Sequence, residues 1–231
     1  MLAASLAAAL AFASPPSAEA DEWHSLLGRS QRGRPIRVHR FGDFSSPRKI
    51  LLVGCIHGNE CQGTKITRRL ARGARPRSID LWIVHQLNPD GRRLRVRQNA
   101  RGVDLNRNFG SQWRRNGRRW DPEYPGPRPW SERETRLARR LVRDVRPDVT
   151  IWYHQPQALV RAWGPSRSTA RRYARLAREP YRSLRWPAGS APNWQNHAFP
   201  GRASFVVELP AGRLPDAAAG RHARAVRRLL D

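Results

Sequence analysis

The chain has 231 residues and a formal net charge of +26, because it carries 44 lysines and arginines against 18 aspartates and glutamates. Its length supports one sizeable hydrophobic core but not two well-filled domains, so we expect a single domain. The basic surface favours contact with polyanions, although a bias toward arginine on a solvated surface would give the same composition, and no RNA-binding or helix-turn-helix signature indicates a specific nucleic-acid partner.

Residues 1–20 are typical of a secretory signal peptide. They contain a short apolar run, a Pro15-Pro16 breaker and the small-x-small sequence Ala18-Glu19-Ala20. No basic residue precedes the run, although signal peptides usually have one there. A transmembrane anchor is less favoured, because the run is too short and too rich in alanine to span a membrane. We therefore predict a signal peptide over residues 1–20 and a mature domain over residues 21–231. The mature protein would be secreted or held in the cell envelope, where anionic cell-wall polymers are the expected polyanion.

The N-terminal half alternates strands with helices. The turn within residues 24–43 predicts a hairpin. Alternating or continuous apolar runs predict strands at residues 36–41, 50–53 and 79–84. Apolar spacing predicts a helix of about three turns between Glu60 and Gly73. Residues 85–91 follow as a turn-rich loop, in which we interpret His85 as structural.

Two polar loops occupy the middle of the chain. Residues 97–109 combine arginine, aspartate and asparagine side chains without apolar periodicity, which predicts an irregular binding loop suited to a carboxylate. Residues 113–130 are dense in proline and glycine and predict a long surface loop. Ser131 and Glu134 form a capping-box pattern before a predicted helix at residues 132–145.

The C-terminal part continues the alternation. Further strands are predicted at residues 148–153 and 204–209, further helices at residues 166–179 and 217–230, and a loop at residues 187–200. Glu208 lies inside the apolar run SFVVEL, and a carboxylate there is costly unless it is paired, protonated or lining a cavity. Glu208 is therefore the best single candidate for a catalytic base. The alternation predicts an α/β fold with a largely parallel sheet and functional groups at the carboxyl ends of its strands.

The sequence ILLVGCIHGNECQ contains the start of a metal site. His57 and Glu60 stand three residues apart after a buried strand, where a helix is expected to begin, and such a pair commonly opens a zinc site. His154 follows the strand at 148–153 and would supply the missing third ligand. Cys55 and Cys61 flank the pair, and two buried thiols or one disulfide are equally consistent with their positions, with a ligand role less favoured.

An ordered set of motifs resembles the zinc carboxypeptidases of the carboxypeptidase A type. The motifs are HGNE at residues 57–60, NPDG at 88–91, RxNxxGVDLNRNF at 97–109, SERET at 131–135, His154 and FVVEL with Glu208. The resemblance runs from Gly28 to Glu208, and its spacing is most similar to the bacterial murein tripeptide amidases. It implies a single α/β domain with a mixed, mostly parallel central sheet, helices on both faces, and hydrolysis of a C-terminal amide bond such as γ-D-glutamyl-diaminopimelate.

The resemblance also implies a metal centre. His57, Glu60 and His154 would hold Zn2+ and leave one coordination position open for water, as a catalytic zinc site requires. Asp104 would accept a hydrogen bond from the second ring nitrogen of His57 and so fix its tautomer.

Four further residues receive roles from the same resemblance. Glu208 would take a proton from the zinc-bound water and deliver it to the leaving amine. Arg97 would stabilise the oxyanion, a contact typically worth about 3–4 kcal/mol. Asn106 and Arg107 would bind the terminal carboxylate of the substrate.

Two features depart from the family pattern. The family carries a tyrosine about two dozen residues before its catalytic glutamate, but no tyrosine occupies the matching region here, since Tyr181 lies too early and Trp186 is the aromatic residue nearest to that region. Asn59 replaces the arginine that digestive members carry inside the H-x-x-E motif. Both differences favour a substrate other than an ordinary polypeptide end. The alternatives are a non-catalytic wall-binding protein on the same scaffold and a deacylase of the aspartoacylase or succinylglutamate type. The complete set of ligands with Glu208 argues against the first, and the full GVDLNRNF loop against the second.

Overall fold

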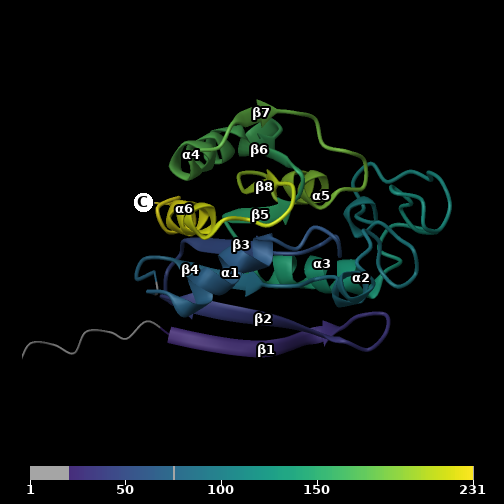
Figure 1. The fold of residues 1–231 in the computed structure, drawn as a ribbon, viewed down its shortest axis with the longest axis horizontal. Helices are drawn as coiled ribbons and strands as arrows, with labels where there is room; N and C mark the ends of the chain where they lie inside the picture. Colours follow the sequence, from purple (N-terminus) through teal and green to yellow (C-terminus); the bar gives the residue numbers. More distant parts are fainter. Residues whose placement is uncertain (1–20, 75, 231) are drawn as a thin grey trace, which may run out of the picture.

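The computed structural model describes residues 21–74 and 76–230, so the predicted signal peptide at residues 1–20 lies outside the described residues. Within these ranges eight strands form one sheet in the order β1-β2-β4-β3-β5-β8-β6-β7 (Figure 1). The strands are β1 (Asp21–Arg29), β2 (Pro35–Gly42), β3 (Lys49–Val53), β4 (Asp80–Val84), β5 (Val149–His154), β6 (Gln157–Ala162), β7 (Tyr181–Ser183) and β8 (Ala203–Pro210).

The centre of the sheet is parallel and its flanks are mixed. Strands β4, β3, β5 and β8 run parallel to one another. The β1–β2, β2–β4 and β6–β8 pairs are antiparallel, and the β6–β7 pair at the edge is parallel. All six residues of β5 are buried, as expected for a strand covered on both faces, and such strands read as continuous apolar runs. The predicted α/β fold with a mixed, mostly parallel sheet is confirmed.

Helices cover both faces of this sheet. They are α1 (Gly63–Arg72), α2 (Pro89–Leu94), α3 (Arg133–Val145), α4 (Arg167–Ala177), α5 (Ala191–Ala198) and α6 (Asp216–Arg227), with short 3-10 turns η1 (Leu105–Arg107) and η2 (Gly164–Ser166). Helices α1, α6 and α4 pack side by side on one face, and α3 and α5 lie on the other (Figure 1). None of the helices in the described ranges combines the length and apolar character that crossing a membrane requires.

Side chains of β5 alternate between these two layers. The hydroxyl of Tyr153 lies 3.1 Å from that of Tyr173 on α4, and the Tyr173 hydroxyl lies 2.9 Å from Nδ1 of His222 on α6. Trp152 points to the opposite face, where its ring packs against Phe109, and Phe109 in turn packs against Trp194 of α5. Alternation along one buried strand therefore ties both helical layers to the sheet.

Four elements differ from the sequence-based expectations. Helix α2 begins inside the loop predicted at residues 85–91, because Asn88 caps it with a side-chain bond to the Gly91 amide and Pro89 is its first residue. Helix α5 lies inside the loop predicted at residues 187–200. Strands β6 and β7 were not predicted, since β6 has the polar-rich sequence QALVRA and β7 has only three residues.

The predicted capping box before α3 is wrong. The Ser131 hydroxyl donates to Glu132 Oε1 at 2.7 Å, and Glu132, the N-cap residue, has no side-chain capping bond. Glu134 instead accepts hydrogen bonds from the Gln31 amide at 3.0 Å and from Asn99 Nδ2 at 3.2 Å. The Ser131 hydroxyl also accepts a hydrogen bond from Asn108 Nδ2 at 2.8 Å. Both polar groups thus have long-range partners, and the SERET motif connects α3 to the binding loop and to the first hairpin.

Close approach of α1 to β5 is set by Gly63, the first residue of that helix. A Cβ at this position would lie 2.3 Å from Cβ of Tyr153 and 2.5 Å from the carbonyl oxygen of Gly54. We expect Gly63→Ala to lower the free energy of unfolding by about 1–3 kcal/mol, because the added methyl overlaps backbone and side-chain atoms that have no room to move. Urea unfolding followed by circular dichroism measures the change.

Gly220→Ala in α6 is the matched control. The nearest atom to a Cβ there is a side-chain nitrogen of Arg224 at 3.5 Å, so the methyl fits. Since glycine weakens a helix interior, this substitution should raise stability by about 0.5–1 kcal/mol. A Gly63→Ala protein as stable as the wild type would contradict the close approach.

Candidate metal and catalytic site

The carboxyl ends of three neighbouring parallel strands carry the predicted site. β3 leads into the turn with His57 and Glu60, β5 ends at His154, and Glu208 is directly opposite His154 in the β5–β8 register. Helix α1 begins only at Gly63, so His57 and Glu60 lie in the turn before the helix rather than in its first residues, which corrects the expectation. A backbone bond of 3.1 Å from the Glu60 amide to the His57 carbonyl closes this turn.

Two glycines and a disulfide hold the turn in place. A Cβ at Gly58 would lie 2.0 Å from the carbonyl carbon of Gly91, so the HGNE and NPDG motifs meet backbone to backbone. Cys55 and Cys61 are joined in a disulfide with their Cα atoms 4.6 Å apart. Of the alternatives left open for this pair, the structure has the disulfide, which spans the turn and leaves neither sulfur free to bind metal.

Three ligand atoms converge in a small triangle. Nδ1 of His57 lies 2.9 Å from Glu60 Oε2, and Nδ1 of His154 lies 3.1 Å from Nδ1 of His57 and 3.0 Å from Glu60 Oε2. All three residues are buried. Ligand atoms about 2.0–2.1 Å from a tetrahedral zinc ion would be roughly 3.3 Å apart, and two histidines with one glutamate are a known donor set of catalytic zinc. The triangle therefore fits Zn2+ with little movement.

A buried network of charges surrounds the triangle. Nε2 of His57 lies 2.8 Å from Asp104 Oδ1, which leaves Nδ1 for the metal. Arg97 bridges the two carboxylates, donating from Nη1 to Glu60 Oε1 at 2.7 Å and from Nε to Asp104 Oδ2 at 3.0 Å. Each carboxylate is thus paired with both a cation and an imidazole, as a buried acid requires.

The same network sets the protonation of the site. Burial acts to raise the pKa values of Glu60 and Asp104, but His57 and neighbouring positive charge hold both pKa values far below the ordinary range. Burial acts to lower the pKa of His57, and the carboxylate of Asp104 raises it above its usual value. Both carboxylates therefore stay ionised, which is the form that binds or supports a metal.

Glu208 and the ligands open into one pocket of about 440 Å³. The lining includes the predicted residues His57, Glu60, His154, Glu208, Arg97, Asn106 and Arg107. Glu208 is only 9% exposed, and within the described part of the chain its Oε2 has no hydrogen-bond partner. Asp104 lies behind His57 rather than in the pocket wall. The structure thus brings all eight predicted residues together.

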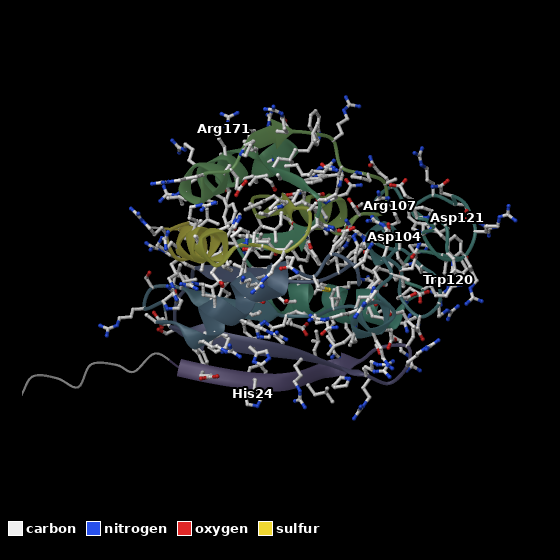
Figure 2. All side chains as sticks on the ribbon, in the orientation of Figure 1. His24, Asp104, Arg107, Trp120, Asp121 and Arg171 are labelled. Carbon is white, nitrogen blue, oxygen red and sulfur yellow. A yellow bond between two sulfur atoms is a disulfide. The ribbon has the colours of Figure 1, made fainter. Side chains whose placement is uncertain are left out.

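Asn106 and Arg107, the residues predicted to bind the substrate carboxylate, both lie in η1. Asn106 accepts a hydrogen bond from the Ala191 amide at 2.9 Å through Oδ1, and its Nδ2 lies 3.4 Å from Nε2 of His154. Arg107 forms an ion pair with Glu123 of the long loop. Figure 2 shows Asp104 and Arg107 close together where the loops leave the sheet. The Arg107–Glu123 pair was not foreseen.

Sequence reasoning missed Arg161 and Ser190 as pocket residues and named Trp186 only as the aromatic residue nearest the missing tyrosine. Arg161, Trp186 and Ser190 also line the pocket, from β6 and from the segment that precedes α5. The signal for Arg161 was a lone arginine between apolar residues in VRA, which is weak in a chain with so many arginines. His85 lies outside the pocket, where its Nδ1 contacts Thr67 Oγ1 at 2.7 Å and burial lowers its pKa to about 4.

Comparison with known proteins gives relatives in sequence and in fold. Murein peptide amidase A of Escherichia coli (strain K12) is 31% identical over 144 residues, which cover 58% of this chain and 59% of that protein. The matched region is thus less than two thirds of that relative. The crystal structure of murein-tripeptide amidase from Escherichia coli O157 has a TM-score of 0.74 at 25% identity and covers 95% of this chain and 93% of that one.

A third relative shows the fold alone. Carboxypeptidase A from Helicoverpa armigera has a TM-score of 0.76 at 19% identity, covering 90% of this chain and 68% of that one. The family model described as zinc carboxypeptidase matches residues 22–196, which is most of the chain. Zn2+ is the cofactor of this family, and the His57, Glu60 and His154 triangle accommodates it. The chain therefore belongs to the zinc carboxypeptidase family.

Proposed function

We propose that this enzyme hydrolyses the C-terminal amide bond of short cell-wall peptides, such as the γ-D-glutamyl-diaminopimelate bond of murein. The proposal depends on one observation: the ligand triangle shares a pocket with Oε2 of Glu208, which has no hydrogen-bond partner among the described residues. Similarity to murein peptide amidase A over part of both chains supports the class of substrate.

In the proposed reaction, Glu208 transfers the proton. Zn2+, when bound, supplies a Lewis acid that polarises the scissile carbonyl. Glu208 accepts a proton from the attacking water and delivers it to the nitrogen of the leaving amine, so the same carboxylate serves as base and then as acid. Its burial excludes bulk water from the transfer, and the absence of a hydrogen bond to Oε2 within the described residues leaves that atom available.

Arg97 and Arg107 bind two different negative charges of the reacting peptide, the oxyanion and the terminal carboxylate. A guanidinium has five N–H groups, and the contacts of Arg97 with Glu60 and Asp104 leave donors for the oxyanion that develops on the scissile carbonyl. Arg107 and Asn106 bind the terminal carboxylate of the peptide. That carboxylate competes with Glu123 for the Arg107 fork, so binding exchanges one ion pair for another.

The proposed location is the cell envelope or its exterior. The signal-like residues 1–20 support export, and the basic surface supports contact with anionic wall polymers. A basic hollow of about 600 Å³ between α1 and α6 is suited to such contact. Its basic lining consists of Lys65, Arg68, Arg69, Arg72 and Arg227.

The first prediction tests the reaction itself. Zinc-loaded wild-type protein should release diaminopimelate from L-Ala-γ-D-Glu-diaminopimelate, measured by mass spectrometry beside ordinary peptides. Glu208→Gln should keep its zinc but lose at least about 100-fold in kcat, because the amide cannot accept the proton. Full turnover by Glu208→Gln would refute the proposed mechanism. Cleavage of ordinary peptides but not of the murein peptide by the wild type would refute the proposed substrate.

The second prediction concerns the support of the metal. Asp104→Asn should weaken zinc affinity about 10–100-fold, because the amide no longer holds the His57 ring as a carboxylate does. Competition with a fluorescent chelator measures the affinity. Asp90→Asn is the control, since Asp90 is a buried carboxylate paired with Arg34 that touches no metal ligand. If both variants lost zinc affinity equally, the support would come from general stability.

The third prediction concerns the terminal carboxylate. Arg107→Ala should raise the inhibition constants of peptides with a free C-terminal carboxylate at least about tenfold while changing those of C-terminally amidated peptides little, because only the former lose a charge-assisted contact. Arg118→Ala, an exposed change on the long loop outside the pocket, should alter neither. Equal weakening of both peptide classes by Arg107→Ala would refute its role.

A further inference from the structure

Three hydrogen-bond donors in the active-site pocket have no partner in the described part of the protein. They are Nε of Arg161, Nε1 of Trp186 and the hydroxyl of Ser190. Trp186 is 9% exposed and Ser190 is 1% exposed, so bulk water does not readily satisfy them. Native proteins leave few buried donors unpaired, and a group of them in one pocket indicates that a ligand supplies the acceptor.

The position of Arg161 is set by the pairing of β6 with β8. Arg161 is directly opposite Val206 in this antiparallel pair, and both residues line the pocket. Residues two apart on a strand share a face, so Arg161 is on the same side of the sheet as Glu208 but one step further back along β8. Asn106 and Arg107, which bind the terminal carboxylate in the proposed function, line the same pocket, so the released residue would occupy the pocket together with Arg161.

The segment before α5 orients the Arg161 guanidinium. Nη2 of Arg161 donates to the carbonyl oxygen of Arg185 at 3.0 Å, and the Trp186 ring centroid lies 5.8 Å from the guanidinium carbon. These contacts leave Nε and Nη1 of Arg161 for a ligand. The donors thus converge from β6 and from one loop on the same part of the pocket.

Arg161 also differs in charge balance from the other pocket arginines. Arg97 pairs with Glu60 and Asp104, and Arg107 pairs with Glu123, whereas the described residues place no carboxylate within ion-pair distance of Arg161. Burial lowers the pKa of Arg161, and the more distant carboxylate of Glu208 opposes that change. A partly buried cation is costly unless an anion pairs with it, so a ligand carboxylate would stabilise Arg161.

We propose that Arg161, with the indole N–H of Trp186 and the hydroxyl of Ser190, forms a subsite for a second carboxylate, carried on the side chain of the residue that the enzyme releases. A planar carboxylate matches the fork of a guanidinium and accepts several hydrogen bonds at once. The inference rests on the proposed function, in which Asn106 and Arg107 bind the main-chain carboxylate. It narrows the substrates to peptides that end in a diacidic residue.

Two substrates differ by this one group. L-Ala-γ-D-Glu-meso-diaminopimelate and L-Ala-γ-D-Glu-L-Lys share every atom except the side-chain carboxylate, because lysine is decarboxylated diaminopimelate. With zinc-loaded full-length protein, the wild type should prefer the first in kcat/KM. Arg161→Gln should lose about 10–100-fold on the first and less than about threefold on the second, since only the first loses a charge-assisted contact. Arg161→Lys should recover part of the preference.

Arg182→Gln is the matched control. Arg182 is opposite Arg161 in the β6–β7 pair, is exposed and lies outside the pocket. Arg182→Gln should leave kcat/KM unchanged for both peptides. Zinc content and circular dichroism of each variant confirm that it folds. If Arg161→Gln lowered kcat/KM equally for both peptides, Arg161 would bind the main-chain carboxylate or support β6, and the subsite would be refuted. A wild-type protein with equal kcat/KM for the two peptides would refute it as well.

Binding and a second pair of peptides separate this inference from the proposed function. Calorimetric titration with free meso-diaminopimelate and with L-lysine requires no turnover, and the tighter binding of diaminopimelate should disappear in Arg161→Gln. If the wild type cleaved neither murein peptide, benzoyl-Gly-Glu and benzoyl-Gly-Gln would take their place. A preference for glutamate that Arg161→Gln abolishes would support the subsite although the murein proposal had failed, and no preference would overturn it.

Discussion

Parallel pairing of β3, β5 and β8 is the constraint on which the rest of the structure depends. Parallel strands end at the same edge of a sheet, so three segments far apart in the chain deliver His57 with Glu60, His154 and Glu208 to one place. The pairing is stable because both faces of these strands are buried under helices. A shift of one residue would turn Glu208 to the other face and separate it from the ligands.

Charge balance decides which polar groups can remain in this buried edge. Glu60 and Asp104 are tolerated because Arg97 spans both and His57 lies between them. Removing one member of such a network leaves an uncompensated buried charge, which costs far more than the network contributes when complete. The acids of the metal centre and the arginine that faces the substrate are therefore one unit, in which structural and chemical roles cannot be separated.

Composition alone does not show that the arginines have different roles. Most project from the outer surface, as Arg171 on α4 does in Figure 2, and are solvated. Arg97 and Arg107 are held by acids inside the pocket. Arg161 has the same side chain but no ion pair within the described residues, so its place in the pocket distinguishes it where its residue type does not. Pairing and burial, rather than number, give an arginine its role.

Local patterns were enough to predict the central strands and the amphipathic helices α1 and α3. The apolar runs of β3, β5 and β8 and the periodicity of α1 and α3 are written in adjacent residues, and the motifs around His57, Glu60, His154 and Glu208 suggested the metal centre. Residues 85–91 and 187–200 were misjudged because proline and asparagine begin short helices as readily as they make loops. Strands β6 and β7 escaped because their sequences lack a strong apolar pattern.

The sequence by itself thus determined the α/β class, the central strands and the identity of the residues that meet at the metal site. Only the tertiary structure decided that Ser131 pairs with Asn108 and Glu134 with Gln31, that Glu123 pairs with Arg107, and that Arg161 lines the pocket. The reason is physical, since strand and helix periods depend on neighbours in the chain, whereas the partner of a charged side chain depends on which distant segments the sheet brings beside it.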